Sequence, residues 1–403
     1  MNSPKIRFKG YTEDWEQRKL GELVGIYDGV HQTPDYQDSG IMFLSVENIA
    51  TLKSEKYISE EAFERDYKVY PEKDDILMTR IGDVGTTNVV ETAEKVAFYV
   101  SLALLKPNGI DSYFLSNAMK TNAFQKGLRE RTLVTAIPQK INKDEIGKID
   151  IFITNNDEEQ KKIGAYFSNL DHLITLHQRK CEQTKTLKKY MLQKMFPQEG
   201  QKVPEIRFEG FTGDWEQRKL GELGTVQTCK RIFKEQTSEK GDIPFFKNGT
   251  IGLEPDSYIS REMYEEFRRL YPYPEVGDTL ISVVGSIGRT AEYTGKDEYF
   301  QDSNVVWLKT DGSINKKFLK ISYQVIKWLI EGSTVKHLYN DNILRSEIVM
   351  PVSQIEQAKI AEFFEELDHL ITLHQRRHLY MKYTSKCMIN ITIIVKETTL
   401  CQN

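Results

Sequence analysis

Several short groups of residues could support catalysis, but each departs from the pattern that its chemistry requires. Residues 285–290 read GSIGRT and resemble a phosphate-binding loop, yet the lysine and the glycine spacing of such a loop are missing. His172 and His177 lie five residues apart, whereas two histidines that bind metal on one helix face lie four apart. The four cysteines are scattered along the chain, which argues against structural zinc and disulfides.

Motifs for cofactor chemistry are missing as well. No GxGxxG sequence opens a dinucleotide-binding unit, and no nucleophile has a neighbouring histidine in a recognisable motif. The tetrapeptide Asn-Pro-Pro-aromatic, the usual pocket for methylating an amino nitrogen, does not occur. The sequence therefore predicts a non-catalytic chain with no catalytic residue, no metal site and no cofactor of its own.

Composition narrows the class of protein. A chain of 403 residues predicts two or three domains, and 39% hydrophobic with 28% charged residues is ordinary for a soluble globular protein. The best apolar run, residues 389–395, is too short for a membrane span, and the N-terminus lacks the apolar core of a signal peptide. Together with the isolated cysteines, this predicts a cytoplasmic location. The net charge of −4 means that any surface for nucleic acid must be local or completed by another subunit.

The chain is an internal duplication. Residues 14–23 read DWEQRKLGEL, and residues 214–223 repeat them letter for letter; sixteen of the twenty positions of residues 4–23 are identical in residues 204–223. Residues 170–179 read LDHLITLHQR, and so do residues 367–376. A period near 200 residues is too long for a solenoid and indicates two whole domains with shared flanks and separate interiors.

The LDHLITLHQR block predicts two long helices. Apolar residues alternate at spacings of four and three, which is a heptad seam, and Asn156 or Asp157 is a suitable N-cap for a helix of about residues 157–195. The strongest seam positions are Ile163, Phe167, Leu170 and Ile174 in the first helix and Ile360, Phe364, Leu367 and Ile371 in the second. We expect the two helices to pack on each other as an antiparallel coiled coil; the alternative is two amphipathic helices that each cover their own domain.

The block at residues 4–23 predicts a domain entrance. Thr12 is expected to cap a short helix that starts with Glu13 and Asp14, and Trp15 is expected in the core. The segment Gln17-Arg18-Lys19 is expected to be more exposed, as a solvated face or a partner contact.

The two interiors share a frame rather than a sequence. Residues 75–85 and 278–288 both read D-x-L-x-x-x-x-G-x-x-G. A helical stretch is expected at residues 113–129 and 317–331, and each is followed by a polar loop, TLVTAIPQKIN or STVKHLYNDN. Apolar runs punctuated by glycine and proline predict α+β interiors.

These features together resemble one known family. PKIRFKGYTEDWEQRKLGEL and its copy PEIRFEGFTGDWEQRKLGEL, the paired LDHLITLHQR helices and the glycine frames are similar to the specificity (S) subunit of type I restriction–modification systems, as found in staphylococci and related bacteria. The resemblance implies a fold of two α/β target recognition domains, separated by two long helices that form an antiparallel coiled coil, in a pseudo-twofold and pseudo-circular arrangement. Its expected parts are a first domain at 1–156 (entrance block 4–23), a helix at 157–196, a second domain at 197–353 (entrance block 204–223), a helix at 354–388 and an atypical tail at 389–403.

The resemblance also implies partners and cofactors. Each interior would read one half of a bipartite site in double-stranded DNA, and the helices would dock two modification (methyltransferase) subunits and set the gap between the half-sites. S-adenosylmethionine, ATP and Mg would be bound by the modification and restriction (translocase/nuclease) subunits, so adenine methyltransferase and type I deoxyribonuclease activity would belong to the holoenzyme alone. The alternatives are a coiled-coil scaffold without sequence-specific DNA binding and a self-contained DNA methyltransferase.

Polar donors in the glycine- or proline-marked loops are the candidate DNA-binding residues, because they suit base edges and phosphates. In the first interior these are His31, Gln32, Tyr36, Arg80, Thr86, Thr87, Gln139, Lys140, Asn142 and Lys143. In the second interior they are Lys230, Arg231, Lys234, Lys247, Asn248, Ser286, Arg289, Lys336, His337, Tyr339 and Asn340.

Overall fold

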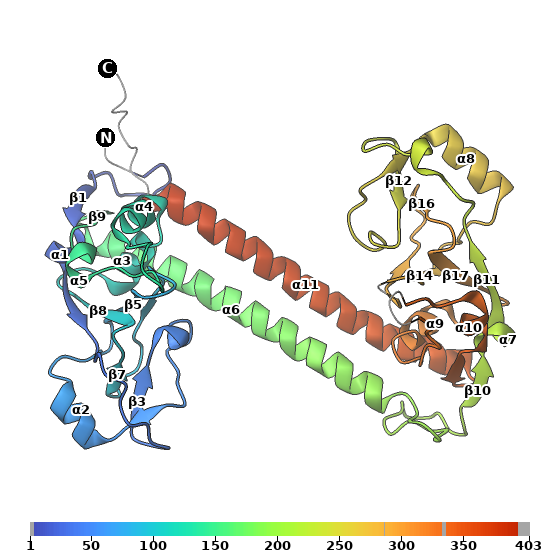
Figure 1. The fold of residues 1–403 in the computed structure, drawn as a ribbon, viewed down its shortest axis with the longest axis horizontal. Helices are drawn as coiled ribbons and strands as arrows, with labels where there is room; N and C mark the ends of the chain where they lie inside the picture. The colour runs from blue at the N-terminus through green and yellow to red at the C-terminus, as the bar shows by residue number, and fades with distance from the viewer. Residues whose placement is uncertain (1–3, 286, 333–335, 394–403) are drawn as a thin grey trace. The chain divides into compact units, whose positions relative to one another are not determined.

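The chain forms two compact units, each with its own core. The computed structural model describes residues 4–285, 287–332 and 336–393. One unit consists of residues 1–179 with residues 375–403, and the other consists of residues 180–374. Each unit is α+β and includes a part of both long helices (Figure 1). This agrees with the predicted fold class of two α+β domains joined by two long helices.

The strands of unit 1 form a pair and two larger sheets. The strand β1 (Glu16–Lys19) pairs antiparallel with the last strand, β9 (Asp150–Ile153). The remaining strands are β2 (Val24–Asp28), β3 (Ile41–Leu44), β4 (Tyr57–Ile58), β5 (Ile76–Thr79), β6 (Thr87–Val89), β7 (Val96–Phe98) and β8 (Leu102–Pro107). One sheet has the order β2-β8-β5-β6, and the other has the order β4-β3-β7, in which β3 and β7 are parallel.

Unit 2 repeats this topology strand for strand. The strand β10 (Glu216–Lys219) pairs antiparallel with β18 (Glu347–Met350). The other strands are β11 (Gly224–Thr228), β12 (Ile243–Phe246), β13 (Tyr258–Ile259), β14 (Thr279–Ser282), β15 (Thr290–Glu292), β16 (Tyr299–Phe300) and β17 (Val305–Thr310). Their orders are β11-β17-β14-β15 and β13-β12-β16, with β12 and β16 parallel. The duplication seen in the flanks therefore extends through interiors whose sequences have diverged.

The glycine frame has the same structural role in both units. Its aspartates accept a backbone N–H three residues earlier, Glu72 N to Asp75 Oδ2 and Glu275 N to Asp278 Oδ2, each at 2.8 Å. The loops that follow β5 and β14 turn at Gly82 and Gly85 (φ +84° and +102°) and at Gly285 and Gly288 (φ +67° and +79°). L side chains rarely adopt these backbone conformations, which explains why glycine stays at these positions while the residues between them differ.

The entrance block differs from its prediction in local structure. No helix begins at Thr12; residues 16–19 are the strand β1, and the helix α1 is Leu20–Leu23. The segment is extended because its backbone pairs with β9, and this tertiary pairing outweighs the local capping signal of Thr12. Trp15 is buried, and Gln17 and Lys19 are exposed, as the sequence predicts.

In each unit the entrance block also binds the first turn of the long helix that follows the interior. Arg7 pairs with the fully buried Glu159 of the helix α6 (Asp157–Lys194), and its Nη2 donates to Glu159 Oε2 at 2.8 Å. Arg207 pairs likewise with Glu356 of the helix α11 (Gln354–Ile393), at 2.7 and 2.9 Å. An aromatic contact repeats beside each pair, Phe8 with Tyr166 at 6.1 Å and Phe208 with Phe363 at 6.2 Å. The same contact with the long helix is therefore formed in both units, by the sequence Ile-Arg-Phe (residues 6–8 and 206–208) and the sequence Glu-Gln (residues 159–160 and 356–357).

The two long helices pack against each other in opposite directions within each unit (Figure 1). In unit 1, Tyr166 OH lies 3.3 Å from Met388 Sδ, and His378 Nδ1 lies 3.2 Å from the carbonyl oxygen of Ile174. In unit 2, Lys188 Nζ lies 2.7 Å from Asp368 Oδ1, and Cys181 Sγ lies 3.9 Å from the carbonyl oxygen of Ile371. Partner numbers fall on α11 as they rise on α6, so the pairing is antiparallel in both units. The pseudo-twofold and pseudo-circular arrangement stays a prediction.

The heptad seam lies where the sequence predicts it, in contact with both the partner helix and the domain core. Every predicted seam position is buried or half-buried: Ile163, Phe167, Leu170, Ile174, Ile360, Phe364, Leu367 and Ile371. Ile163 and Phe167 also belong to the core of unit 1, and Ile360 and Phe364 to that of unit 2. The expected coiled coil and its alternative, helices covering their own domains, are therefore both realised.

The end of the second helix does not follow its prediction. The sequence predicts an atypical tail from residue 389, because β-branched residues are weak helix formers. The helix α11 instead continues to Ile393. Ile389 is buried in the core of unit 1, and Asn390 Oδ1 accepts the backbone N–H of Asn122 at 2.9 Å. Burial of this turn outweighs its low helix propensity; residues 394–403 lie outside the described residues.

The helices inside the units are shorter than the sequence predicts. The stretch at 113–129 is two helices, α3 (Ser112–Ala118) and α4 (Asn122–Arg131), because Thr121 caps the second one. The stretch at 317–331 is helical only in α9 (Lys316–Ser322), since Val325, Ile326 and Trp328 pack against the core after it. The remaining helices are α2 (Glu60–Asp66), α5 (Lys143–Ile146), α7 (Leu220–Leu223), α8 (Arg261–Leu270) and α10 (Asn340–Arg345), with 3-10 turns at Val46–Asn48 and Lys234–Gln236.

Candidate nucleic-acid interface

Two of the predicted polar loops of unit 1 are joined through their backbones. The loop after β5 meets the loop between α4 and α5 at a bridge that pairs Ile81 with Lys140, and Lys140 also pairs with Leu133 within the second loop. The N–H of Gly82 donates to the carbonyl oxygen of Gln139 at 2.9 Å, and Gln139 Nε2 donates back to that of Gly82 at 2.9 Å. Candidate residues that are some sixty positions apart in sequence therefore share one surface.

Arg80 links this pair of loops to the end of β2. Its guanidinium pairs with Asp28, and its Nε donates to the carbonyl oxygen of Ile141 at 3.2 Å. Arg80 is 7% exposed, and burial lowers its pKa, although a guanidinium stays cationic at neutral pH. We therefore interpret Arg80 as a residue that positions the loop after β5 and the loop between α4 and α5, rather than one that contacts a base.

Thr87 also faces inward. It is buried on β6, and its Oγ1 lies 2.9 Å from Ser116 Oγ. Lys143 is half-buried, and the other first-interior candidates are exposed: His31, Gln32, Tyr36, Thr86, Gln139, Lys140 and Asn142. The proposed DNA surface of unit 1 consists of these exposed side chains, without Arg80 and Thr87.

Unit 2 joins the corresponding loops in the same way. Bridges pair Val284 with His337 and Glu331 with His337, and the N–H of Leu338 donates to the carbonyl oxygen of Val283 at 2.9 Å. Here Asn248 takes the linking role, since its Nδ2 donates to the carbonyl oxygen of Val284 at 2.5 Å. The scaffold of the loops is therefore repeated, while the side chains mounted on it differ.

The second set of candidates lies mostly at the surface. Lys230, Arg231, Lys234, Lys336, Tyr339 and Asn340 are exposed, and Lys247, Asn248, Arg289 and His337 are half-buried. Ser286 lies outside the described residues. Several cations already have partners: Arg231 with Asp302 at 2.7 Å, Lys247 with Asp256 at 2.8 Å and Lys230 over the ring of Tyr271 at 4.9 Å. His337 and Tyr339 stack with ring centroids 5.5 Å apart.

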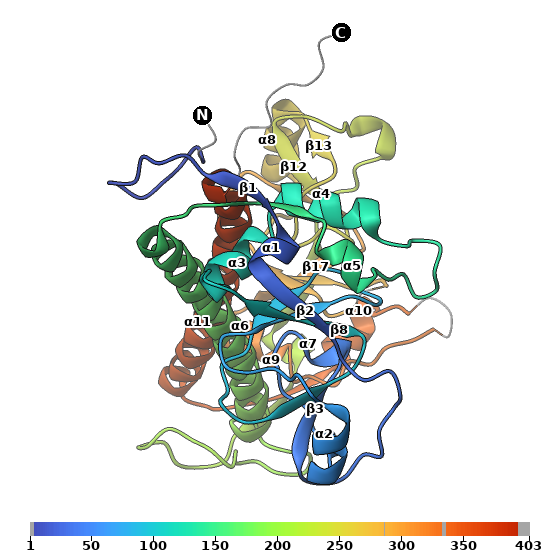
Figure 2. The same cartoon turned by 90° about the vertical axis from the view of Figure 1, so that its left-hand side faces the viewer.

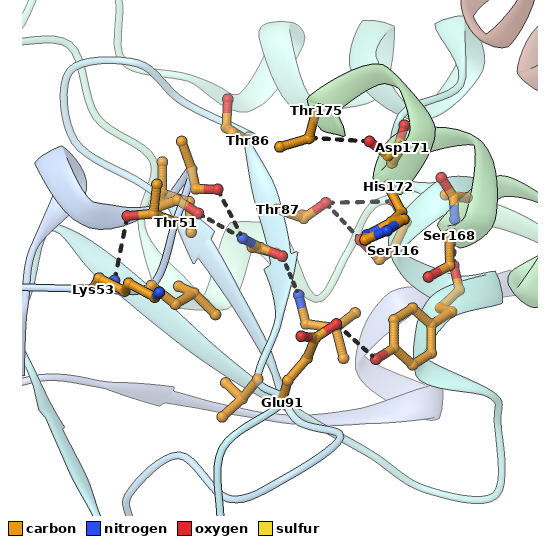
Figure 3. Close-up of a pocket in the computed structure, with 18 of the residues that line it drawn as sticks. Thr51, Lys53, Thr86, Thr87, Glu91, Ser116, Ser168, Asp171, His172 and Thr175 are labelled. Carbon is orange, nitrogen blue, oxygen red and sulfur yellow. Dashed lines mark hydrogen bonds between the residues drawn. The ribbon is translucent and has the colours of Figure 1, made fainter. Parts of the chain in front are cut away.

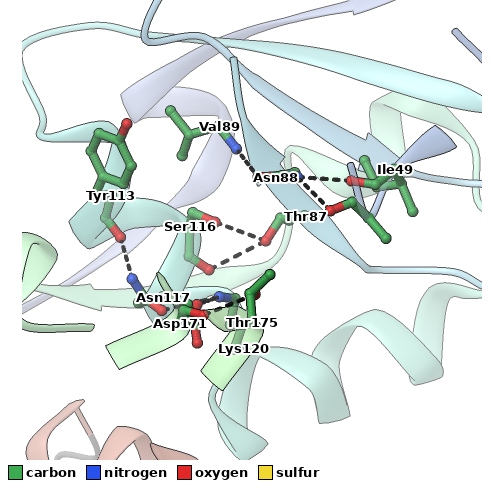
Figure 4. Close-up of polar contacts among 11 residues, drawn as sticks. Ile49, Thr87, Asn88, Val89, Tyr113, Ser116, Asn117, Lys120, Asp171 and Thr175 are labelled. Carbon is green, nitrogen blue, oxygen red and sulfur yellow. Dashed lines mark hydrogen bonds and ion pairs between the residues drawn. The ribbon is translucent and has the colours of Figure 1, made fainter. Parts of the chain in front are cut away.

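A cavity of about 820 Å³ lies in unit 1 between β6, α3 and α6 (Figure 3). Its walls carry both signs of charge, from Lys53 and Lys120 and from Glu91 and Asp171. Figure 4 shows polar contacts among several of the lining residues; Lys120 Nζ lies 2.9 Å from Asp171 Oδ2, and Asn88 Nδ2 donates to the carbonyl oxygen of Ile49 at 2.9 Å. The balanced charge argues against a phosphate site, and the Lys120–Asp171 pair indicates that these contacts hold α6 against the domain.

Comparison with known proteins accounts for the doubled architecture. The sequence profile of the type I restriction modification DNA specificity domain matches residues 12–186 and again residues 212–379. The chain belongs to the type I restriction–modification specificity subunit family. Each match of this family starts in an entrance block and ends in a long helix, so the family's domain is one half of the duplication.

Individual relatives agree with the family. A type I restriction enzyme specificity subunit of Haemophilus influenzae is 46% identical over 158 residues, which cover 38% of this chain and 41% of that protein. The MjaX specificity subunit of Methanocaldococcus jannaschii is 24% identical and is matched over 98% of this chain and 96% of its own. The S subunit of a type I restriction–modification system from M. genitalium has the same fold, with a TM-score of 0.69 at 14% identity over 98% of this chain and 100% of that chain.

In the residues that the structure describes, no three His, Cys, Asp or Glu side chains are grouped to hold a metal ion. Cys181, Cys229 and Cys387 are free thiols, and burial raises the pKa of Cys229 to about 12. Among the helices of the described part of the chain, none is both long and apolar enough to cross a membrane.

The role of Arg80 predicts a defect confined to one half-site. Replacing Arg80 by Ala removes the link between Asp28 and Ile141, and we expect discrimination at the first half-site to fall about tenfold, since charge-assisted hydrogen bonds contribute roughly 1.5–3 kcal/mol. Arg80→Lys keeps the charge beside Asp28 but lacks the planar fork, so partial rescue is expected. Methylation rates on duplexes altered in one half-site at a time measure this, and equal losses at both half-sites would contradict a local positioning role.

Proposed function

We propose that this specificity subunit reads a bipartite site in double-stranded DNA, with one unit for each half-site. The supporting observation is that one loop scaffold is built twice, on the same strand order, with different exposed donors on each copy. Phosphate contacts would hold the register of each unit, and side chains at base edges would select the sequence. A scaffold without a DNA role would not need two different polar surfaces on one frame.

The proposed partners supply the chemistry. Two modification subunits would bring S-adenosylmethionine and methylate adenine, and restriction subunits would bring ATP, Mg and nuclease activity, in the cytoplasm. Any self-contained methyltransferase activity would need a cofactor motif, and none occurs in the sequence. We therefore assign to this chain site selection and assembly, not catalysis.

One experiment tests site selection. The chain is produced with and without its modification subunits, and DNA from the producing cells is mapped for methylated adenine. We expect a single bipartite methylated sequence with the complete complex and none with this chain alone. Methylation without sequence preference would favour the scaffold alternative, and methylation by the purified chain alone would favour the self-contained enzyme.

The long helices predict how the spacer between the half-sites can be changed. One heptad inserted into both α6 and α11 at matched positions keeps the phase of the seam and adds about 10.5 Å. Because B-DNA rises about 3.4 Å per base pair, the spacer is expected to lengthen by roughly three base pairs, with both half-sites unchanged. The methylation map of an active insertion variant checks this; an unchanged spacer would show that the helices do not set the distance.

A further inference from the structure

Unit 1 carries an exposed apolar hairpin within one of the two loops proposed to contact DNA. The connection between α4 and α5 extends away from the body of the unit (Figure 2). At its tip Ile137 is 100% exposed and Val134 is 69% exposed, and Leu133 at its base is 45% exposed. Water-exposed branched side chains gain free energy when a partner covers them, so such a tip has the character of a binding element.

The hairpin is held in place rather than free to fold back. Leu133 N–H donates to the carbonyl oxygen of Lys140 at 2.8 Å and closes the hairpin, and Ala136 N–H donates to that of Leu133 at 3.3 Å. The bridge from Lys140 to Ile81 and the bond from Ile141 N–H to the carbonyl oxygen of Arg80 at 3.0 Å fix its base to the glycine loop. A fixed base presents Ile137 at a set position relative to the exposed donors.

The charge around the hairpin indicates what covers it. In a chain of net charge −4, residues 126–145 carry five cations and three anions: Lys126, Arg129, Arg131, Lys140 and Lys143 against Glu130, Asp144 and Glu145. Cations at the base and apolar atoms at the tip match a partner with an anionic exterior and an apolar interior. Duplex DNA has this arrangement, with phosphates outside and stacked bases inside.

We propose that Ile137 is an apolar wedge that enters the base stack at one step of the first half-site and partly unstacks it. The inference rests on the proposed DNA-reading function and adds a mode of readout: deformable steps, such as pyrimidine–purine steps, would be favoured at that point without a hydrogen bond to a base. Val134 covers the flank of the opened step, and Lys140 lies within the same hairpin to contact the phosphates.

The test uses the complex of this chain with its modification subunits and duplexes that carry its mapped site. 2-Aminopurine, whose fluorescence rises when it is unstacked, replaces one base at a time in the first half-site. The methylated adenine is left out, because methyltransferases flip their target base. We expect a rise at one step for the unaltered complex and no rise for Ile137→Ala, with about tenfold weaker binding, since burial of an isoleucine side chain contributes a factor of ten or more.

A matched control separates the wedge from the loss of any exposed branched side chain. Val276 is 65% exposed in the turn before β14, away from the long helices and the candidate DNA-binding residues, and the Val276→Ala variant should behave like the unaltered complex. Neither substitution removes core packing, so both variants should fold.

Four outcomes would overturn the wedge. The first is site-specific methylation without a fluorescence rise at any step, and the second is a rise that persists in Ile137→Ala. The third is loss of the Ile137 effect when thymine is replaced by deoxyuridine. The fourth is weaker assembly of Ile137→Ala with the modification subunits at unchanged DNA affinity. The third would mean that the tip contacts thymine methyl groups, and the fourth that it binds protein. Failure of the proposed function is distinct, because no specific methylated site would then exist to carry the probe.

Discussion

Exchange of residues 24–156 for the interior of another family member is expected to replace one half of the methylated sequence and to leave the other half unchanged. The contacts that receive the interior depend largely on backbone atoms. These contacts are the ladder between β1 and β9, the bond of Asp111 N–H to Gln160 Oε1 at 2.9 Å and that of Asn122 N–H to Asn390 Oδ1 at 2.9 Å. Backbone donors stay the same when side chains change, so the interior of another family member should make the same hydrogen bonds to β1, Gln160 and Asn390.

Methylation mapping of cells that carry the exchanged chain measures this outcome. The matched exchange of residues 224–353 should change the opposite half-site, since Gln357 Oε1 accepts Asn315 N–H at 2.8 Å in the equivalent position of unit 2. The two exchanges combined should give a site with both halves new. If either exchange altered both halves, the interiors would not read independently.

Arg7→Ala is expected to destabilise unit 1 by about 3–5 kcal/mol, because it leaves a buried carboxylate without its counter-charge. Glu159 is fully buried, and its side chain is left with one bond, from Thr154 Oγ1 at 2.6 Å. Hydrogen exchange in each unit measures the effect, which should raise exchange in β1, β9 and the start of α6 and leave unit 2 at its original rate. Arg207→Ala should produce the mirror result through Glu356.

Two further variants identify the cause of this loss. The pair Lys327–Glu199 is highly exposed on both sides, so water screens it and Lys327→Ala should leave the stability of unit 2 nearly unchanged. The double variant Arg7→Met with Glu159→Leu removes both charges and should recover most of the lost stability. A double variant as unstable as Arg7→Ala would assign the loss to packing instead of to the buried charge.

Sequence periodicity predicted the long helices and their seam because heptad spacing is a local signal that tertiary contacts reinforce. Two other local signals failed: low helix propensity at Ile389, where burial in the core of unit 1 decides the outcome, and the capping signal of Thr12 before residues 16–19, where a partner strand more than 130 positions away decides it. Such long-range terms are invisible in a short window of sequence.

The residues of the candidate site were likewise predicted only where local sequence decides their role. Residue type indicated which loops carry donors, and within each unit the loop after β5 or β14 does meet the loop before α5 or α10. It could not show that Arg80 and Thr87 face inward, since burial depends on Asp28, Ile141 and Ser116. It also overlooked Ile137, because a search for hydrogen-bond donors passes over an aliphatic side chain, and only its exposure in three dimensions singles it out.

The last turns of α11 determine when unit 1 can complete its folding during synthesis. Residues 375–393 belong to unit 1, and the whole of residues 180–374 is inserted ahead of them. While unit 2 is being synthesised, the core around Ile163 and Phe167 must therefore wait for Ile389, which leaves the ribosome more than two hundred residues after the insertion begins. The earlier half of the protein can complete its folding only after the later half has emerged. A frameshift or early stop in α11 would therefore leave the core of unit 1 open, although most of unit 1 lies far from α11 in sequence. Chaperones and proteases recognise such an exposed core.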